Sequence, residues 1–266
     1  MDRGGDGVLV VVGVGMTLAG RTAVVTGGGT GLGASISRHL ADNGARVIVV
    51  GRRIEPITEL AASLSVEARA EVCDVADPAS VDLLVGSLAG EEVSVLVNNA
   101  GIAGPVAPLV DVVPDEWDEV FATNVRGTYL MCRGFLPAMC ERGDGDVVNV
   151  ASVSGKRPLE RRTPYVASKM AVIGLTSTLA FEVGDAGVRV NALSPGPVEG
   201  ERMHRNFTLE AERTGTSYAG ARAAFVGRSA LGRMVTEDEV GAAVVAMLAM
   251  RGMTGADVDL SAGMIA

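Results

Sequence analysis

The chain has 266 residues and a formal net charge of −9, and 48% of its residues are hydrophobic but only 3% aromatic. This composition suits one α/β domain with an aliphatic core. The acidic balance argues against a nucleic-acid partner, because a protein that binds the phosphate backbone needs a basic face. The 3 cysteines, an odd number without metal-ligand spacing, indicate reduced thiols in a cytoplasmic protein without a metal site.

Residues 1–15 differ from the rest of the chain. They contain a short apolar run, Val8–Val14, behind an acidic leader. The run lacks the basic start of an export signal and is too short to span a bilayer, so we expect no membrane association. We expect residues 1–15 to be a disordered extension, with Met16 as the natural start, and residues 16–266 to form a single domain.

From Thr22 onward, short β-branched runs alternate with longer amphipathic stretches. This rhythm predicts an α/β protein with a doubly wound parallel β-sheet and helices on both faces. The stretch from Pro195 to Arg233 is expected to be an irregular excursion from this pattern. The expected strands are Thr22–Thr26, Arg46–Val50, Ala70–Cys73, Val93–Val97, Asp146–Val150, Val188–Leu193 and Asp257–Leu260.

A glycine-rich turn follows the first expected strand. Residues 26–33 read TGGGTGLG, and a helix is expected over Ala34–Asn43. Between a strand and a helix, glycines permit a tight turn and let backbone N–H groups approach a pyrophosphate. An ordinary glycine-rich turn is the alternative, whereas a kinase or ATPase is disfavoured because the P-loop lysine is absent. The expected phosphate-binding residues are Gly27, Thr30, Gly31, Leu32 and Gly33.

The end of the second expected strand bears on which dinucleotide binds. Dinucleotide-binding sheets commonly place an acid there, on the ribose 2′-hydroxyl of NAD, but this chain reads Gly51-Arg52-Arg53. Gly51 leaves room, and the planar guanidinium of Arg52 suits a 2′-phosphate. We therefore expect a modest preference for NADP(H), with NAD(H) as the alternative if both arginines only face solvent.

A tyrosine and a lysine stand four residues apart in an expected helix. Residues at i and i+4 share one helical face, so Lys169 is expected beside Tyr165. A phenol with an ordinary pKa of about 10 acts near neutral pH only if a neighbour such as this ammonium lowers its pKa. Alone, such a pair is uninformative, because helices often carry it for packing and solubility.

Together these segments resemble the short-chain dehydrogenase/reductase family, from about Leu18 to Gly263. The resemblance implies a Rossmann fold and hydride transfer between a nicotinamide cofactor and a secondary alcohol or ketone. Its motifs are the turn at residues 26–33, Asp74-Val75, Asn98-Asn99-Ala100-Gly101, Asn124, Ser152, Tyr165-x-x-x-Lys169 and Pro195-Gly196.

The resemblance implies a role for four catalytic residues. Tyr165 would exchange a proton with the substrate oxygen, and Ser152 would hydrogen-bond the same oxygen. Lys169 would grip the nicotinamide ribose while lowering the pKa of the tyrosine, and Asn124 would hold a water in a proton relay. Further cofactor contacts would come from Arg52, Asp74, Val75, Asn98, Ala100, Gly101, Tyr165, Lys169, Pro195, Gly196 and Val198. By contrast, we expect Ser168 to be a structural hydroxyl and His39 to lack a paired acid.

One loop departs from the family. After Pro195-Gly196 the family usually supplies a threonine to the cofactor, whereas this chain has Gly200. The nicotinamide amide would then be held by backbone groups, at Val198, or by Glu199.

Two charged segments bear on the substrate. Lys156–Arg162 is mostly basic and precedes Tyr165, so it would attract a small polar or anionic substrate. The alternatives are salt bridges across a subunit interface and simple exposure to water. The segment Glu201–Arg228 is polar and irregular enough to be a lid.

Further expectations concern partners and rival functions. The resemblance implies a homotetramer that buries the helices expected over Asp115–Arg142 and Pro164–Gly184. The main rival activity is a 3-oxoacyl-thioester reductase, acting on acyl carrier protein or CoA derivatives with NADPH. A dinucleotide-binding regulator without turnover is the rival of another class.

Overall fold

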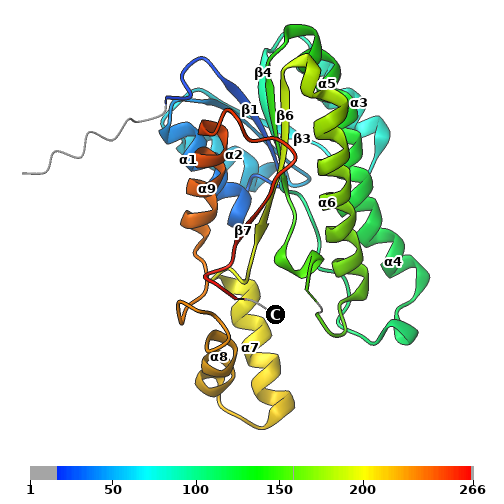
Figure 1. The fold of residues 1–266 in the computed structure, drawn as a ribbon, viewed down its shortest axis with the longest axis vertical. Coiled ribbons are helices and arrows are strands. Elements are labelled where there is room, and N and C mark those ends of the chain that lie inside the picture. Colours follow the sequence, from blue (N-terminus) through cyan, green and yellow to red (C-terminus); the bar gives the residue numbers. More distant parts are fainter. Residues whose placement is uncertain (1–16, 158, 265–266) are drawn as a thin grey trace, which may run out of the picture.

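The computed structural model describes residues 17–157 and 159–264, so the expectations for residues 1–16 lie outside the described residues. Within those ranges, seven parallel strands form one sheet in the order β3-β2-β1-β4-β5-β6-β7. This order confirms the doubly wound α/β fold (Figure 1). The strands are β1 (Thr22–Thr26), β2 (Arg46–Gly51), β3 (Ala68–Val72), β4 (Val93–Asn98), β5 (Gly145–Val150), β6 (Val188–Pro195) and β7 (Asp257–Leu260).

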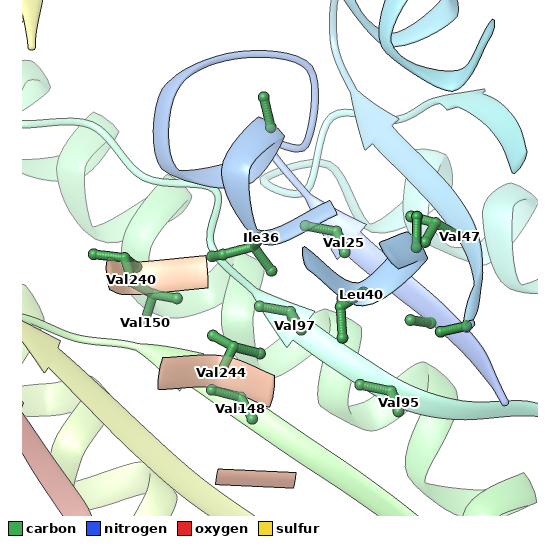
Figure 2. Close-up of a cluster of buried hydrophobic side chains, with 14 of the residues drawn as sticks. Val25, Ile36, Leu40, Val47, Val95, Val97, Val148, Val150, Val240 and Val244 are labelled. Carbon is green, nitrogen blue, oxygen red and sulfur yellow. The ribbon is translucent and has the colours of Figure 1, made fainter. Parts of the chain in front are cut away.

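Helices cover both faces of the sheet (Figure 1). Alternate residues of one strand point to opposite faces, so Ala23 and Val25 join one apolar cluster and Val24 the other. Figure 2 shows the first cluster, where Ile36 and Leu40 meet Val240 and Val244 over the strands. The helices on that face are α1 (Gly31–Asp42), α2 (Ile54–Ser63) and α9 (Glu237–Ala249); those on the other are α3 (Pro78–Ser87), α5 (Gly127–Arg142) and α6 (Thr163–Val183).

The predicted strands agree with the structure to within two residues at every end. The largest difference is β3, expected over Ala70–Cys73 but observed over Ala68–Val72. Its register is set by backbone pairing with Val47–Gly51 of β2, which an apolar pattern does not report. The expected helix over Asp115–Arg142 is also not uniform, because α4 (Pro114–Phe121) and α5 are joined by a π-helical segment at Ala122–Arg126.

The segment after β6 is helical, so its expected irregularity is wrong. It contains α7 (Glu201–Thr214) and α8 (Tyr218–Val226), which project from the sheet (Figure 1). Met203 and Phe207, one helical turn apart on α7, pack with Val226 of α8 and with Met234. These few apolar residues within a polar sequence were enough to pair the two helices. We call α7 and α8 together the lid.

Two charged networks were not expected from the sequence. His39 on α1 pairs with Asp238 on α9, with 2.8 Å between Nε2 and Oδ1, so the expectation of no paired acid is wrong. Near the amino-terminal ends of the strands, the Asp146 carboxylate lies 2.7 Å from Arg21 and 2.5 Å from Arg189. The partners in both networks are far apart in sequence, which is why sequence inspection did not find them.

Candidate active site

A cleft of about 1460 Å³ opens where the carboxyl ends of the strands meet. The chain winds from β1 outward to β3 and then returns to β4 on the other side of β1. Loops after neighbouring strands diverge at such a switch point, which is where doubly wound sheets bind ligands. Arg205 on α7 and Glu237 on α9 also line the cleft, although no motif in the sequence predicted either residue there.

The glycine turn lines one wall of the cleft in a conformation that excludes side chains. Gly27 and Gly31 have φ of +62° and +53°, where residues with a side chain are strained. A Cβ on Gly33 would lie 2.1 Å from the Gly27 carbonyl oxygen, so the helix start and the turn are in direct contact. Thr30 and Leu32 line the same wall, and the Thr30 side chain does not cap α1. The geometry fits a pyrophosphate, because backbone N–H groups at the start of α1 have no side-chain cap.

Asn99, rather than the expected Asn98, belongs to the cleft. Its Nδ2 donates to the carbonyl oxygens of Thr26 at 2.9 Å and Gly27 at 3.3 Å, which fixes the glycine turn to the end of β4. The Asn98 amide instead donates to Asn149 Oδ1 at 2.9 Å, inside the protein. Successive strand residues point to opposite faces, so only one asparagine of the pair faces the cleft. Ala100 and Gly101 line the cleft as expected.

The ends of β2 and β3 form the second wall. Gly51, Arg52, Asp74 and Val75 all line it, and so does Arg53, which the sequence-based prediction omitted. A Cβ on Gly51 would lie 2.9 Å from Ile57 Cγ2, so the site has little space for a residue with a side chain. Arg52 and Arg53 are exposed, and neither has an ion pair among the described residues.

Ser152, Tyr165 and Lys169 lie together in the cleft. Ser152 follows β5, and its Oγ accepts a hydrogen bond from the Ser154 backbone N–H at 3.1 Å. Tyr165 and Lys169 share one face of α6, with Lys169 Nζ 5.8 Å from the centre of the tyrosine ring. Lys169 is buried, and its ammonium donates to the Val150 carbonyl oxygen at 2.8 Å. The end of β5 therefore positions the serine directly and the lysine through a backbone contact.

Asn124 lies behind the cleft wall. It occupies the π-helical segment, a feature that is frequent at functional sites. Its Oδ1 accepts from the Ile102 backbone N–H at 2.8 Å, and its Nδ2 donates to the Ile102 carbonyl and to Ser168 Oγ. Gly101 separates it from the cleft, since a Cβ there would lie 3.1 Å from Asn124 Oδ1 and 3.5 Å from Lys169 Nζ. Ser168, which we expected to be a structural hydroxyl, is buried and donates to the Tyr165 carbonyl oxygen at 2.7 Å.

The loop after β6 also lines the cleft. Pro195, Gly196, Val198 and Glu199 all contribute to it. The Glu199 carboxylate, however, forms an ion pair with the Arg222 guanidinium of the lid, at 3.2 Å. Of the two groups expected to hold a nicotinamide amide, the backbone at Val198 therefore fits better.

The first two basic residues of the segment before Tyr165 form ion pairs with other residues of the chain. Lys156 pairs with Asp257 at 2.7 Å and also with Asp259, and Arg157 lies 3.5 Å from Asp259. Although burial opposes its charged form, hydrogen bonds to these two aspartates raise the pKa of Lys156 above its ordinary value. The expected attraction of a substrate anion by these two residues is therefore not supported, because carboxylates on β7 already neutralise them.

Comparisons with known proteins agree with this geometry. The profile described as short chain dehydrogenase matches residues 21–211. A D-threitol dehydrogenase of Mycolicibacterium smegmatis is 40% identical over 193 residues, which cover 71% of this chain and 74% of the relative. A NAD+-bound xylitol dehydrogenase superimposes with a TM-score of 0.87 and 29% identity, covering 92% of this chain and 99% of that one. A variant of the actinorhodin polyketide ketoreductase with NADPH gives a TM-score of 0.86 and 32% identity, covering 92% and 97%.

The parallel sheet, the glycine turn and the Ser-Tyr-Lys group define a nicotinamide-dependent oxidoreductase. The chain belongs to the short-chain dehydrogenase family, whose profile matches most of its length. It transfers hydride between a nicotinamide cofactor and an alcohol or ketone.

Proposed function

We propose that the chain interconverts a secondary alcohol and its ketone with Tyr165 as the acid–base catalyst. The observation that carries this proposal is the placement of Ser152, Tyr165 and Lys169 in the cleft that the glycine turn also lines. When bound, the nicotinamide supplies or accepts the hydride at the substrate carbon. The side chains of this chain then act on the substrate oxygen and on its proton.

Each catalytic side chain has a contact that supports its proposed role. Ser152 Oγ accepts from Ser154 N–H, which leaves its hydroxyl hydrogen for the substrate oxygen. The Lys169 ammonium, held by the Val150 carbonyl, stabilises negative charge on the Tyr165 oxygen. Asn124 positions the loop at Ile102 and lies next to Lys169, with its proposed relay water on that side.

For the substrate, we propose a small polar, uncharged alcohol of the polyol type. The polyol dehydrogenases among the relatives favour it, as does the pairing of Lys156 and Arg157 with carboxylates of β7. The test is a panel of polyols, hydroxy acids and aromatic sulfonates, with absorbance of the reduced nicotinamide as the readout. Turnover of the anionic compounds alone would contradict a neutral substrate.

The alternative substrate is a 3-oxoacyl thioester. It is favoured by the likeness to the actinorhodin ketoreductase, because a reductase of that kind uses the same fold. Reduction of an acetoacetyl thioester with a kcat/KM above that for every polyol would select this alternative. A regulator without turnover would be inactive with every compound of both classes.

For the cofactor, we propose a modest preference for NADP(H). Arg52 and Arg53 line the cleft without ion pairs among the described residues, and no acid stands at position 51 to repel a 2′-phosphate. A charge-assisted contact contributes about 1.5–3 kcal/mol, which corresponds to roughly a ten- to hundredfold preference if it is not screened by solvent. Because both arginines are exposed, we expect the lower end of that range.

Arg52→Ala is expected to raise the KM for NADP(H) about tenfold while changing that for NAD(H) less than about twofold, because only NADP(H) carries the 2′-phosphate. Initial rates at varied cofactor concentration give both constants. Arg38→Ala is the matched control, since it removes an exposed arginine that does not line the cleft, and it should leave both constants unchanged. Equal losses for the two cofactors, or a wild-type preference for NAD(H), would show that Arg52 is only a solvated loop residue.

We also propose that α6 forms a subunit interface in a homotetramer. Among the described residues, the helix at Thr163–Ala186 is long and apolar enough to cross a membrane by length and composition, yet only 28% of its apolar window is buried within the chain. Its inner face packs on the sheet and carries Lys169, while Met170 and Phe181 face outward at 48% and 89% exposure. A second copy of the chain would cover this outer face.

Light scattering at micromolar concentration should therefore show a tetramer, and Phe181→Asp should shift it toward smaller species. The physical reason is that a carboxylate would lose its hydration in an apolar interface. Leu83→Asp, on the exposed side of α3, is the control for a surface charge and should leave the tetramer intact. A wild-type monomer at this concentration would contradict the proposal.

We propose a reducing, cytoplasmic setting for the enzyme. Cys73, Cys132 and Cys140 are free in the structure. Burial raises the pKa of the Cys132 thiol to about 12, against the weaker opposing effect of its hydrogen bond from Asn98. That thiol is therefore protonated and unreactive at neutral pH.

A further inference from the structure

The carboxylate of Glu237 lies against the glycine turn at the positive end of α1. A Cβ built on Gly31 would be 3.6 Å from Glu237 Oε1, and one built on Gly200 would be 3.2 Å from the same atom. Glu237 is half-buried and lines the cleft, between the start of α1 and the base of the lid. Within the described part of the chain, no hydrogen bond or ion pair engages this carboxylate.

The start of α1 otherwise carries no negative group. Its N-cap residue, Thr30, makes no side-chain cap, and its first turn contains no acid. The positive end of a helix attracts an anion, and here the nearby anion comes from another helix, α9. The backbone of Glu237 is fixed in this place, because Ser35 Oγ on α1 donates to its carbonyl oxygen at 2.7 Å. Only rotation of the side chain can therefore move the carboxylate away.

We propose that Glu237 is an intramolecular competitor for the diphosphate of the cofactor and so sets the cofactor affinity. This inference rests on the proposed function, in which the glycine turn binds the diphosphate. A bound diphosphate and the Glu237 carboxylate would share the positive end of α1 and repel each other. The enzyme therefore binds its cofactor more weakly than its glycine turn alone would allow, which favours release of the product cofactor.

The test compares Glu237→Gln with the wild-type protein by isothermal titration calorimetry. We expect Glu237→Gln to lower the Kd of both NADP+ and NADPH by about three- to tenfold, because the amide keeps the size of the side chain but removes its charge. The Kd of ADP-ribose, which has the diphosphate but no nicotinamide, should fall by the same factor. Asp238→Asn is the matched control: it removes one charge from the adjacent residue, whose carboxylate pairs with His39 instead of facing the turn, and should leave every Kd unchanged.

The outcomes distinguish a failure of the proposed role of Glu237 from a failure of the proposed function. Tighter binding of all three ligands to Glu237→Gln alone would support the competition. Unchanged or weaker binding to this variant, with normal binding to the wild type, would overturn the role of Glu237 and leave the proposed function intact. Tighter binding of NADP+ or NADPH without tighter binding of ADP-ribose would also overturn the proposed competition. The carboxylate would then act on the nicotinamide instead of the diphosphate. A wild-type protein that binds no dinucleotide would overturn the proposed function itself.

Discussion

Tyr165→Phe is expected to lower kcat at least about a hundredfold and to leave the Kd of the cofactor within about twofold. The phenol is the group proposed to exchange a proton with the substrate oxygen, and it stands in the cleft beside Ser152 and Lys169. Removing one oxygen atom keeps the ring, so the packing of α6 and the binding of the cofactor should persist. Steady-state rates, together with calorimetric titration of the cofactor, separate the two effects.

Tyr129→Phe is the matched control for this experiment. It also removes one phenolic oxygen, but Tyr129 is half-exposed on α5 and does not line the cleft. Its turnover should equal that of the wild type. A Tyr165→Phe enzyme with nearly normal turnover would remove Tyr165 from the reaction. A parallel loss of cofactor binding would instead indicate that the ring was displaced.

The central strands were predictable because they are buried on both faces. β1, β4 and β5 are buried along their whole length, so they appear in the sequence as nearly continuous apolar runs. The lid helices lack such a signal, since they bury only a few residues, such as Met203 and Phe207, within a polar sequence. A segment that packs mainly on itself leaves a weak pattern, and we therefore expected an irregular loop there.

The site was predictable where function depends on local spacing. Tyr165 and Lys169 are one helical turn apart, and residues 26–33 form one continuous turn, so the sequence alone defines both. Asn98 and Asn99 show the limit of this reasoning, because identical neighbouring residues face opposite sides of the sheet. The position of Glu237 could not be predicted from the sequence, because α9, near the end of the chain, brings it to the glycine turn. Long-range placement of this kind has no local signature.

Asp146→Ala is expected to have the largest effect on stability, and it too depends on residues that are distant in sequence. The Asp146 side chain is 4% exposed and bridges two arginines, Arg21 directly before β1 and Arg189 in β6. Those arginine side chains are only 13% and 12% exposed. Removing the carboxylate would leave two positive charges close together and largely shielded from water. Loss of one partner from a buried ion pair typically costs about 3–5 kcal/mol, because the remaining charge stays desolvated.

Urea denaturation at one fixed protein concentration should therefore show a loss of about 3–5 kcal/mol in the free energy of unfolding for Asp146→Ala. Asp144→Ala is the matched control, two residues earlier in the chain. Its carboxylate is 57% exposed and lies 3.9 Å from Arg251, which is 70% exposed, so we expect a loss below about 1 kcal/mol. Arg21 also donates to the Ser94 carbonyl at 2.6 Å, and Arg189 to the Met250 carbonyl at 2.7 Å. If these carbonyls alone compensate the two guanidinium groups, Asp146→Ala will lower the free energy of unfolding no more than Asp144→Ala. The network will then not be a main source of stability at the amino-terminal ends of the strands.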